Sequence, residues 1–282
     1  MHIFIGIFSL FHKFGPDSGL RRKKTAAILP FPGDAKACGE SKRDDILADI
    51  ELSVIIPAKN EWNTIARVVG DVHSVCGGLM ASHEILVIVE AVDKQTATAA
   101  DRAGAAVIRQ SRPGYGGALL EGFDRAAGSW ILTMDADLSH PPDFLKTLWD
   151  MRGGRDMVIA SRWAPGGRAD MPVHRYILSR LLNRIFSSAL NIAVRDLSSG
   201  FRLYKSESLK SVEFEGVHFD ILQSILSAML EAGHRVVEAP FDYRPRADGQ
   251  SNARIFEFGL CYFKALYGLF KKRSLRQKHR GG

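Results

Sequence analysis

The feature that most constrains the fold of this 282-residue chain is an alternation of short β-branched runs with helical stretches, beginning at Leu52. The expected strands cover residues 52–56, 84–90, 105–109, 130–134 and 156–160. The expected helices cover residues 62–76, 94–103, 115–127 and 142–151. This alternation predicts an α/β fold with a mostly parallel sheet and helices on both faces. Ligands of such sheets bind beyond the carboxyl ends of the strands, so candidate chemistry is sought in the loops there.

The alternation stops after Ser161, and three further helices are expected over residues 175–192, 219–231 and 254–270, with an extended segment at 234–243. The last helix carries aromatic and aliphatic residues on one face at helical spacing. We therefore predict three parts: an apolar segment and flexible linker in residues 1–50, an α/β domain in 51–253, and an amphipathic interfacial helix with a basic tail in 254–282.

The net charge of +7 indicates anionic partners. Basic residues cluster at 21–24 and 271–280, beside apolar stretches, which favours the surface of an anionic membrane. Nucleic acid is not expected as a partner, because the tails lack interleaved base-stacking aromatic residues. No apolar run reaches about 18 residues, so no transmembrane helix is predicted, and residues 1–14 are interpreted as an interfacial anchor. The three cysteines share no short spacing, which indicates neither a disulfide framework nor a zinc site.

The strongest chemical signal is the segment 134–142 (MDADLSHPP), which follows a predicted buried strand. Asp135 and Asp137 place two carboxylates at the carboxyl end of that strand, where they can hold Mg²⁺ or Mn²⁺ together with a nucleotide diphosphate. Such a cation neutralises charge that develops on a leaving diphosphate. The purely structural alternative is that Asp and Ser cap the helix that follows.

Two more loops stand at strand–helix junctions. Residues 53–61 (SVIIPAKNE) end a strand and open a helix whose free N–H groups can face a ligand. Residues 112–118 (RPGYGGA) supply glycines that allow a ligand to approach the backbone closely. A capped helix start and a structural glycine turn remain equally good interpretations of these two segments taken alone.

Taken together, these segments resemble the inverting family 2 of GT-A-fold glycosyltransferases, and within it the dolichyl- or polyprenyl-phosphate mannosyl- and glucosyltransferases. The resemblance runs from about Leu52 to Phe270. Its most specific parts are the segments 134–141 (MDADLSHP) and 199–204 (SGFRLY), in that order. Further parts are the segments 56–61 (IPAKNE), 114–118 (GYGGA), 161–163 (SRW) and 246–251 (RADGQS).

The resemblance implies specific site residues. The nucleotide-sugar pocket would be lined by Pro57, Ala58, Glu61, Glu90, Gly114, Asp135, Ala136 and Asp137. The divalent cation, Mg²⁺ or Mn²⁺, would be held by Asp135, Asp137 and Ser139. The acceptor phosphate would be held by Arg162, Arg175, Arg202 and Arg246, and the catalytic set would be Asp137, Arg162 and Arg246.

Two departures from the family pattern concern the nucleotide end of the site. Relatives usually end the second strand with Asp-Asp-Gly-Ser, whereas this chain has Glu90 and Asp93 in the segment VEAVD. Glu90 is the favoured replacement for the missing acidic group, and Asp93 is the alternative. Relatives also tend to carry Tyr where Lys59 stands.

The expected activity is transfer of a sugar, with inversion, from GDP-mannose or a UDP-sugar to a polyprenyl or dolichyl phosphate. A lipid phosphate is already negatively charged, so it needs cationic residues rather than a general base. We expect the enzyme to be peripheral on the cytoplasmic face of a membrane, with a membrane subunit as a further partner. One alternative is a transferase acting on a glycan or lipid hydroxyl with Asp220 as base. Another is a non-catalytic membrane-associated subunit of the same fold.

Overall fold

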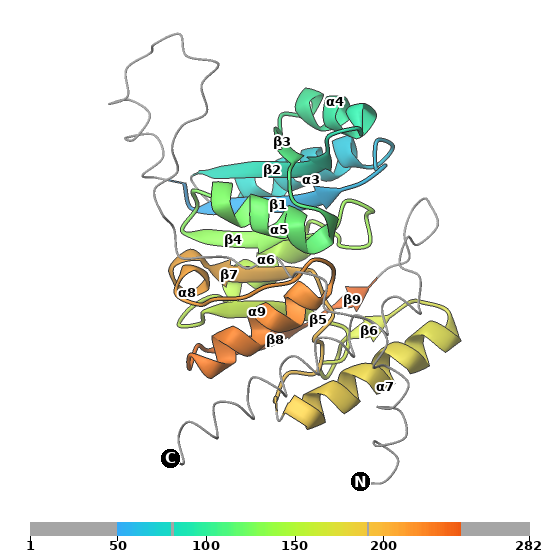
Figure 1. Cartoon of the computed structure of the whole chain (residues 1–282), viewed down its shortest axis with the longest axis vertical. Helices are drawn as coiled ribbons and strands as arrows, with labels where there is room; N and C mark the ends of the chain where they lie inside the picture. The colour runs from blue at the N-terminus through green and yellow to red at the C-terminus, as the bar shows by residue number, and fades with distance from the viewer. Residues whose placement is uncertain (1–49, 80–81, 191, 244–282) are drawn as a thin grey trace.

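The computed structural model describes residues 50–79, 82–190 and 192–243. They contain a seven-stranded sheet with the order β3-β2-β1-β4-β7-β5-β8 (Figure 1). All neighbouring strands are parallel except β7, which runs antiparallel to β4 and β5. The strands are β1 (Leu52–Ala58), β2 (His83–Glu90), β3 (Ala106–Gln110), β4 (Trp130–Thr133), β5 (Met157–Ser161), β7 (Arg202–Lys205) and β8 (Val236–Pro240).

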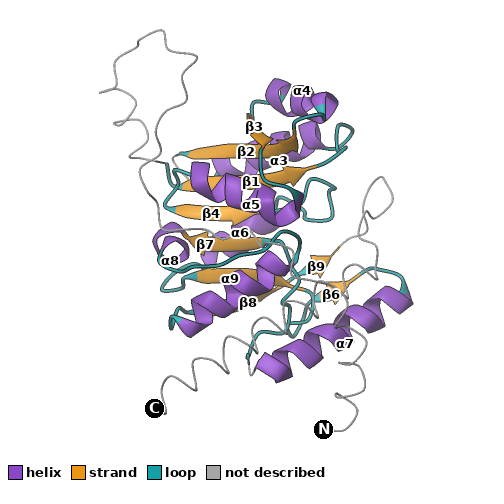
Figure 2. Cartoon of the chain, in the orientation of Figure 1, coloured by secondary structure: helices purple, strands orange, loops and turns teal. Residues whose placement is uncertain are grey.

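Helices cover both faces of this sheet (Figure 2). One face packs against α3 (Ile65–Gly77), α4 (Lys94–Arg102) and α6 (Phe144–Asp150). The other packs against α5 (Gly114–Arg125), α8 (Ser206–Lys210) and α9 (Asp220–Glu231). Because side chains alternate along a strand, Val54 and Ile56 face the first group of helices, while Ile55 faces the second.

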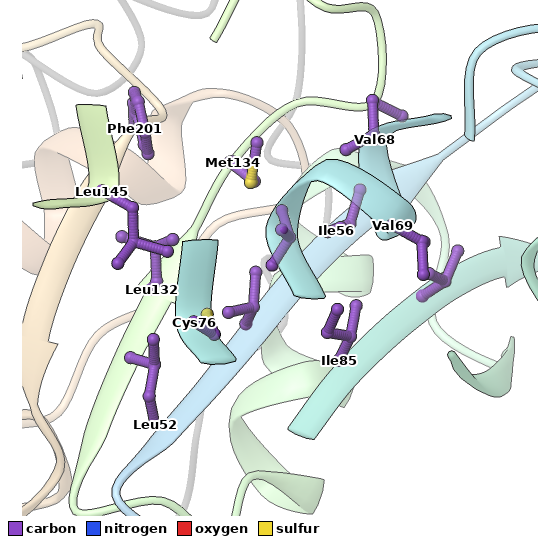
Figure 3. Close-up of a cluster of buried hydrophobic side chains, with 14 of the residues drawn as sticks. Leu52, Ile56, Val68, Val69, Cys76, Ile85, Leu132, Met134, Leu145 and Phe201 are labelled. Carbon is purple, nitrogen blue, oxygen red and sulfur yellow. The ribbon is translucent and has the colours of Figure 1, made fainter. Parts of the chain in front are cut away.

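The hydrophobic core between the sheet and helices α3, α4 and α6 explains why the sequences of the central strands are so apolar. Leu52 and Ile56 of β1 lie beside Leu132 of β4, and α3 covers them with Val68 and other side chains at helical spacing (Figure 3). Strands buried on both faces have near-continuous apolar sequences, which is what β1 and β2 show.

The order in which the chain connects the strands creates a crevice at one edge of the sheet. From β1 the chain moves outward to β2 and β3, and then returns to the other side of β1 as β4. The order therefore reverses between β1 and β4, and ligands of such sheets bind at the carboxyl ends of the strands at this point. A two-stranded sheet of β6 (Arg168–Ala169) and β9 (Asp242–Tyr243), together with helix α7 (Val173–Leu190), completes the described structure.

The α/β class, the five predicted strands and the six predicted helices within the described residues are confirmed, with ends shifted by up to three residues. The extended segment predicted over 234–243 contains β8 and β9. Strands β6 and β7 and helix α8 were not predicted. The helix expected over 254–270 and the segment 1–49 lie outside the described residues, so the proposed division into three parts stays a prediction.

Candidate active site

A cleft of about 540 Å³ lies at the carboxyl edge of the central strands. Loops that follow β1, β2, β4 and β5 contribute to it, as do α7 and the segment before β7. Ten of the residues predicted for the site line this single cleft: Pro57, Ala58, Glu61, Glu90, Gly114, Asp135, Ala136, Asp137, Arg162 and Arg175. The fold thus brings together residues that are up to 118 positions apart in the sequence.

The two aspartates leave β4 in a tight turn. Asp137 Oδ1 accepts hydrogen bonds from Ser139 N at 3.0 Å and from Ser139 Oγ at 2.5 Å. Between them, Leu138 has φ of +63°, a left-handed conformation that costs a branched residue free energy and that often marks functional turns. Ser139 is buried and does not line the cleft, so the structure does not support it as a cation ligand; it orients Asp137 instead.

Asp135 and Asp137 fit a hard divalent cation. Both are oxygen donors and both line the cleft. Within the described residues, no group of three or more His, Cys, Asp or Glu side chains is arranged to hold a metal ion. The protein would therefore supply two carboxylates, and water and phosphate oxygens would fill the other positions, which is how Mg²⁺ is commonly bound.

Lys59 and Glu90, which stand at the two positions that depart from the family pattern, form an ion pair. Lys59 Nζ lies 2.7 Å from Glu90 Oε1, and both side chains line the cleft. Asp93 has a different role, because it accepts hydrogen bonds from Asn60 N at 2.7 Å and Thr96 N at 3.1 Å and so caps α4. Of the two candidate acidic groups, Glu90 is therefore the one that the structure places in the cleft.

The glycine-rich loop is joined to the segment before α9. Gly116 N donates to Val217 O at 2.8 Å. Gly114 has φ of +77°, and a Cβ at this position would clash with the same carbonyl oxygen. Tyr115 stacks on Phe219 with ring centroids 4.3 Å apart. Burial, and then the negative charge of Asp135, raise the pKa of Tyr115 well above its ordinary value, so its hydroxyl stays protonated.

Arg162 is held at the cleft by a buried carboxylate. Its Nε and Nη2 each lie 2.8 Å from an oxygen of Asp196, and Nη2 also donates to Ser198 Oγ at 2.6 Å. The side chain of Asp196 is 0% exposed and that of Arg162 is 13% exposed. Burial alone would raise the pKa of Asp196, but the Arg162 guanidinium outweighs it and holds that pKa below its ordinary value. The pair is therefore charged and fixes the direction of Arg162.

The other arginines predicted to hold the acceptor phosphate lie in different environments. Arg175, in the first turn of α7, lines the cleft. Arg202 does not: it is fully buried on β7, where its guanidinium donates to the carbonyls of Ser199, Leu222 and Leu197 at 2.6–2.7 Å. The expectation that Arg202 holds the acceptor phosphate is therefore wrong, since backbone carbonyls occupy its donors. Arg246 lies outside the described residues.

Asp220, the candidate base of the alternative reaction, stands in the first turn of α9. Its Oδ1 accepts a hydrogen bond from His218 N at 2.8 Å. His218 and Phe219 line the cleft, whereas Asp220 is not among the described residues that do. Its carboxylate therefore binds the backbone of the turn that leads into α9.

Sequence reasoning missed three residues of the site. Asp196 belongs to no recognisable motif, and it lies 34 positions from Arg162 in the sequence, so only the folded structure shows that the two residues pair. Tyr115 and His140 lay inside segments already singled out, but neither was assigned a role. Tyr115 could have been found as the one aromatic side chain in the glycine-rich loop 112–118.

Comparison with known proteins identifies the chain. The family model described as glycosyl transferase family 2 matches residues 53–212. The chain belongs to glycosyl transferase family 2. Polyprenol monophosphomannose synthase of Mycolicibacterium smegmatis is 33% identical over 215 residues, which cover 70% of this chain and 79% of that protein. Dolichol-phosphate mannosyltransferase of Pyrococcus furiosus is 31% identical over 79% of this chain, and the match spans 64% of that longer protein.

Solved structures agree on the fold of this family 2 glycosyltransferase. Glucosyl-3-phosphoglycerate synthase from Mycobacterium tuberculosis, in complex with Mn²⁺, UDP and phosphoglyceric acid, superposes with a TM-score of 0.62. Its sequence is 20% identical, and the match covers 84% of each chain. The GT-A fold predicted from the sequence is thereby confirmed.

Proposed function

We propose that this glycosyltransferase transfers a hexose, with inversion, from a nucleotide sugar to the phosphate of a polyprenyl or dolichyl phosphate. GDP-mannose and UDP-sugars are the favoured donors. One observation carries the proposal: the same cleft is lined by two carboxylates, by the guanidinium groups of Arg162 and Arg175, and by apolar side chains of α7. Those three kinds of group match a cation-bound diphosphate, an acceptor phosphate and the lipid chain attached to it.

Helix α7 links the cleft to an exposed apolar surface. Leu178 and Leu182 line the cleft. On the same helix Val173, Ile177 and Leu181 follow at intervals of four residues, and they are 73%, 59% and 51% exposed. With Leu178 they form what is called here the α7 stripe. A contiguous apolar stripe of this kind is costly in water and typical of a helix that lies on a membrane.

An acceptor that is already anionic explains why the cleft needs arginines more than a base. A sugar hydroxyl has to lose a proton as it attacks, so its transferase needs a general base near neutral pH. Asp220, the candidate for that role, instead accepts a hydrogen bond from the backbone of His218 and is not among the described residues that line the cleft. The phosphate of a lipid monophosphate needs positive charge to approach the donor diphosphate, and Arg162 and Arg175 supply it.

The donor would occupy the part of the cleft formed by the ends of β1, β2 and β4. Asp135 and Asp137 would hold Mg²⁺ or Mn²⁺, with Ser139 orienting Asp137. Such a cation, when bound, neutralises negative charge on the leaving nucleoside diphosphate. Glu90 and its partner Lys59 would face the base or ribose.

For the location, we propose a peripheral enzyme on the cytoplasmic face of a membrane. The α7 stripe and the basic clusters at 21–24 and 271–280 support this placement. In the part of the chain that the structure describes, no helix is both long and apolar enough to cross a bilayer.

The proposal is tested by two variants in one kinetic series, with lipid phosphate varied at saturating donor. Arg175→Ala removes a phosphate contact worth about 1.5–3 kcal/mol, so the KM for lipid phosphate should rise roughly 10- to 100-fold while the KM for donor changes little. Asp220→Asn should keep most of the turnover, because no deprotonation is required. Loss of turnover in Asp220→Asn combined with a silent Arg175→Ala would establish the hydroxyl-acceptor reaction instead.

A further inference from the structure

His140 is a buried imidazole that contacts the aspartate pair. It is 4% exposed and lines the cleft. Its Nδ1 lies 2.9 Å from the backbone N of Asp135, and its Nε2 lies 3.7 Å from Oδ2 of the same residue. One ring therefore faces both the backbone and the carboxylate of Asp135.

The first of these contacts fixes which nitrogen of the neutral ring carries the proton. A backbone N–H can only donate, so Nδ1 must be the acceptor and the proton must lie on Nε2. The Nε2–H group is thus the ring's remaining donor, on the side of the Asp135 carboxylate. At 3.7 Å this contact is longer than a hydrogen bond, and contacts of this kind in ligand-free enzymes often shorten when ligands bind.

Aromatic packing fixes the orientation of the ring. His140 stacks on Phe201 with centroids 4.9 Å apart and planes 18° apart. The rings of Phe241 and Tyr243 approach it edge-on, with centroids at 6.0 and 6.5 Å. A phenylalanine could keep these aromatic contacts. It would lack the two ring nitrogens, both of which face Asp135.

We propose that His140 is a positioning residue of the transfer reaction. Through Nδ1 it holds the backbone of the aspartate turn, and through Nε2–H it directs the carboxylate of Asp135 toward the divalent cation and the donor diphosphate. The inference rests on the proposed function only in that Asp135 takes part in binding the cation and the nucleotide.

Three substitutions separate the two nitrogens. His140→Phe keeps the ring stacking on Phe201 and removes both hydrogen-bonding groups. His140→Asn can place its side-chain oxygen near the position of Nδ1, and His140→Gln can place its amide nitrogen near the position of Nε2. His73→Phe is the control, because His73 pairs with His83 and is not among the described residues that line the cleft.

The readout is the affinity for Mn²⁺ in the presence of GDP or UDP, measured by electron paramagnetic resonance, with thermal unfolding of the same samples. Loss of a group that orients a metal ligand typically lowers metal affinity 10- to 100-fold. We expect a loss of this size in His140→Phe, no loss in His73→Phe, and partial recovery in His140→Gln. His140→Asn should recover thermal stability more than Mn²⁺ affinity.

Two results overturn the proposal and leave the proposed function standing. One is unchanged Mn²⁺ affinity in a folded His140→Phe. The other is a loss of affinity in all three variants that follows their loss of stability, or failure of all three to fold, since the ring would then serve only the fold. If the wild-type protein binds no Mn²⁺ with either nucleotide, the proposed donor site itself fails, and the role of His140 fails with it.

Discussion

At the scale of single residues, Asp196 decides where Arg162 points. Its pKa is held below the ordinary value, so the pair contributes stability that is complete above the unfolded-state pKa of about 4 and is lost as the pH falls further. Asp196→Asn leaves a buried guanidinium without its counter-charge, which typically costs about 3–5 kcal/mol. We expect that loss in urea unfolding at pH 7, together with a shallower decline of stability between pH 5 and 3 (about the range in which an aspartate titrates). A variant as stable as the wild type would show that the ion pair does not hold Arg162.

The pair of Lys59 and Glu90 is a different case, because both side chains are well exposed. Exposed ion pairs contribute about 0–1 kcal/mol to stability, so Lys59→Met and Glu90→Gln should leave the unfolding free energy within that range. Both should weaken binding of the nucleotide, since these side chains line the cleft. Calorimetric titration with GDP and with UDP measures this effect. Unchanged affinity for both nucleotides in both variants would remove the pair from the donor site.

At the scale of elements, the sequence pattern predicted the layers of the sheet and most of the cleft, because strand and helix periodicities are local properties. Strand β7 was not predicted, because its four residues (RLYK) contain no β-branched run. Only the fold supplies the three carbonyls that let a guanidinium be buried there. For the same reason Arg202 was wrongly expected at the acceptor phosphate, whereas Asp135 and Asp137, which were singled out by a short motif at a strand end, do line the cleft.

The α7 stripe is expected to contribute to membrane binding. Ile177→Ser removes an apolar side chain whose burial in a bilayer interface is worth about 1.5–3 kcal/mol, so partition onto vesicles should fall roughly tenfold or more. The melting temperature should change little, because Ile177 is exposed in the protein. Val92→Ser, a change at an exposed apolar residue on the loop after β2, is the matched control. Equal vesicle binding by wild type and Ile177→Ser, in co-sedimentation, would contradict the membrane role of α7.

At the scale of the whole molecule, the net charge of +7 adds an electrostatic component to the apolar one. Each basic residue near an anionic surface contributes roughly 1 kcal/mol, and this contribution is screened by salt. Binding to vesicles with anionic phospholipid should therefore weaken from 0.05 to 0.5 M NaCl (roughly the range over which the Debye length falls below 10 Å), whereas binding to neutral vesicles should be weak throughout. Removal of residues 254–282 should flatten the salt dependence. Salt-independent binding of the full chain would assign attachment to apolar contacts alone.

The identity of the product tests the proposed function most directly. Purified protein is incubated with Mn²⁺, with GDP-mannose or UDP-glucose, and with an equal mixture of a polyprenyl phosphate and the corresponding free polyprenol, and the lipids are analysed by mass spectrometry. We expect a hexosyl-phosphoryl polyprenol, formed with at least one donor and lost in Asp137→Asn. A sugar linked to the free polyprenol, with the polyprenyl phosphate left unmodified, would contradict the proposed function.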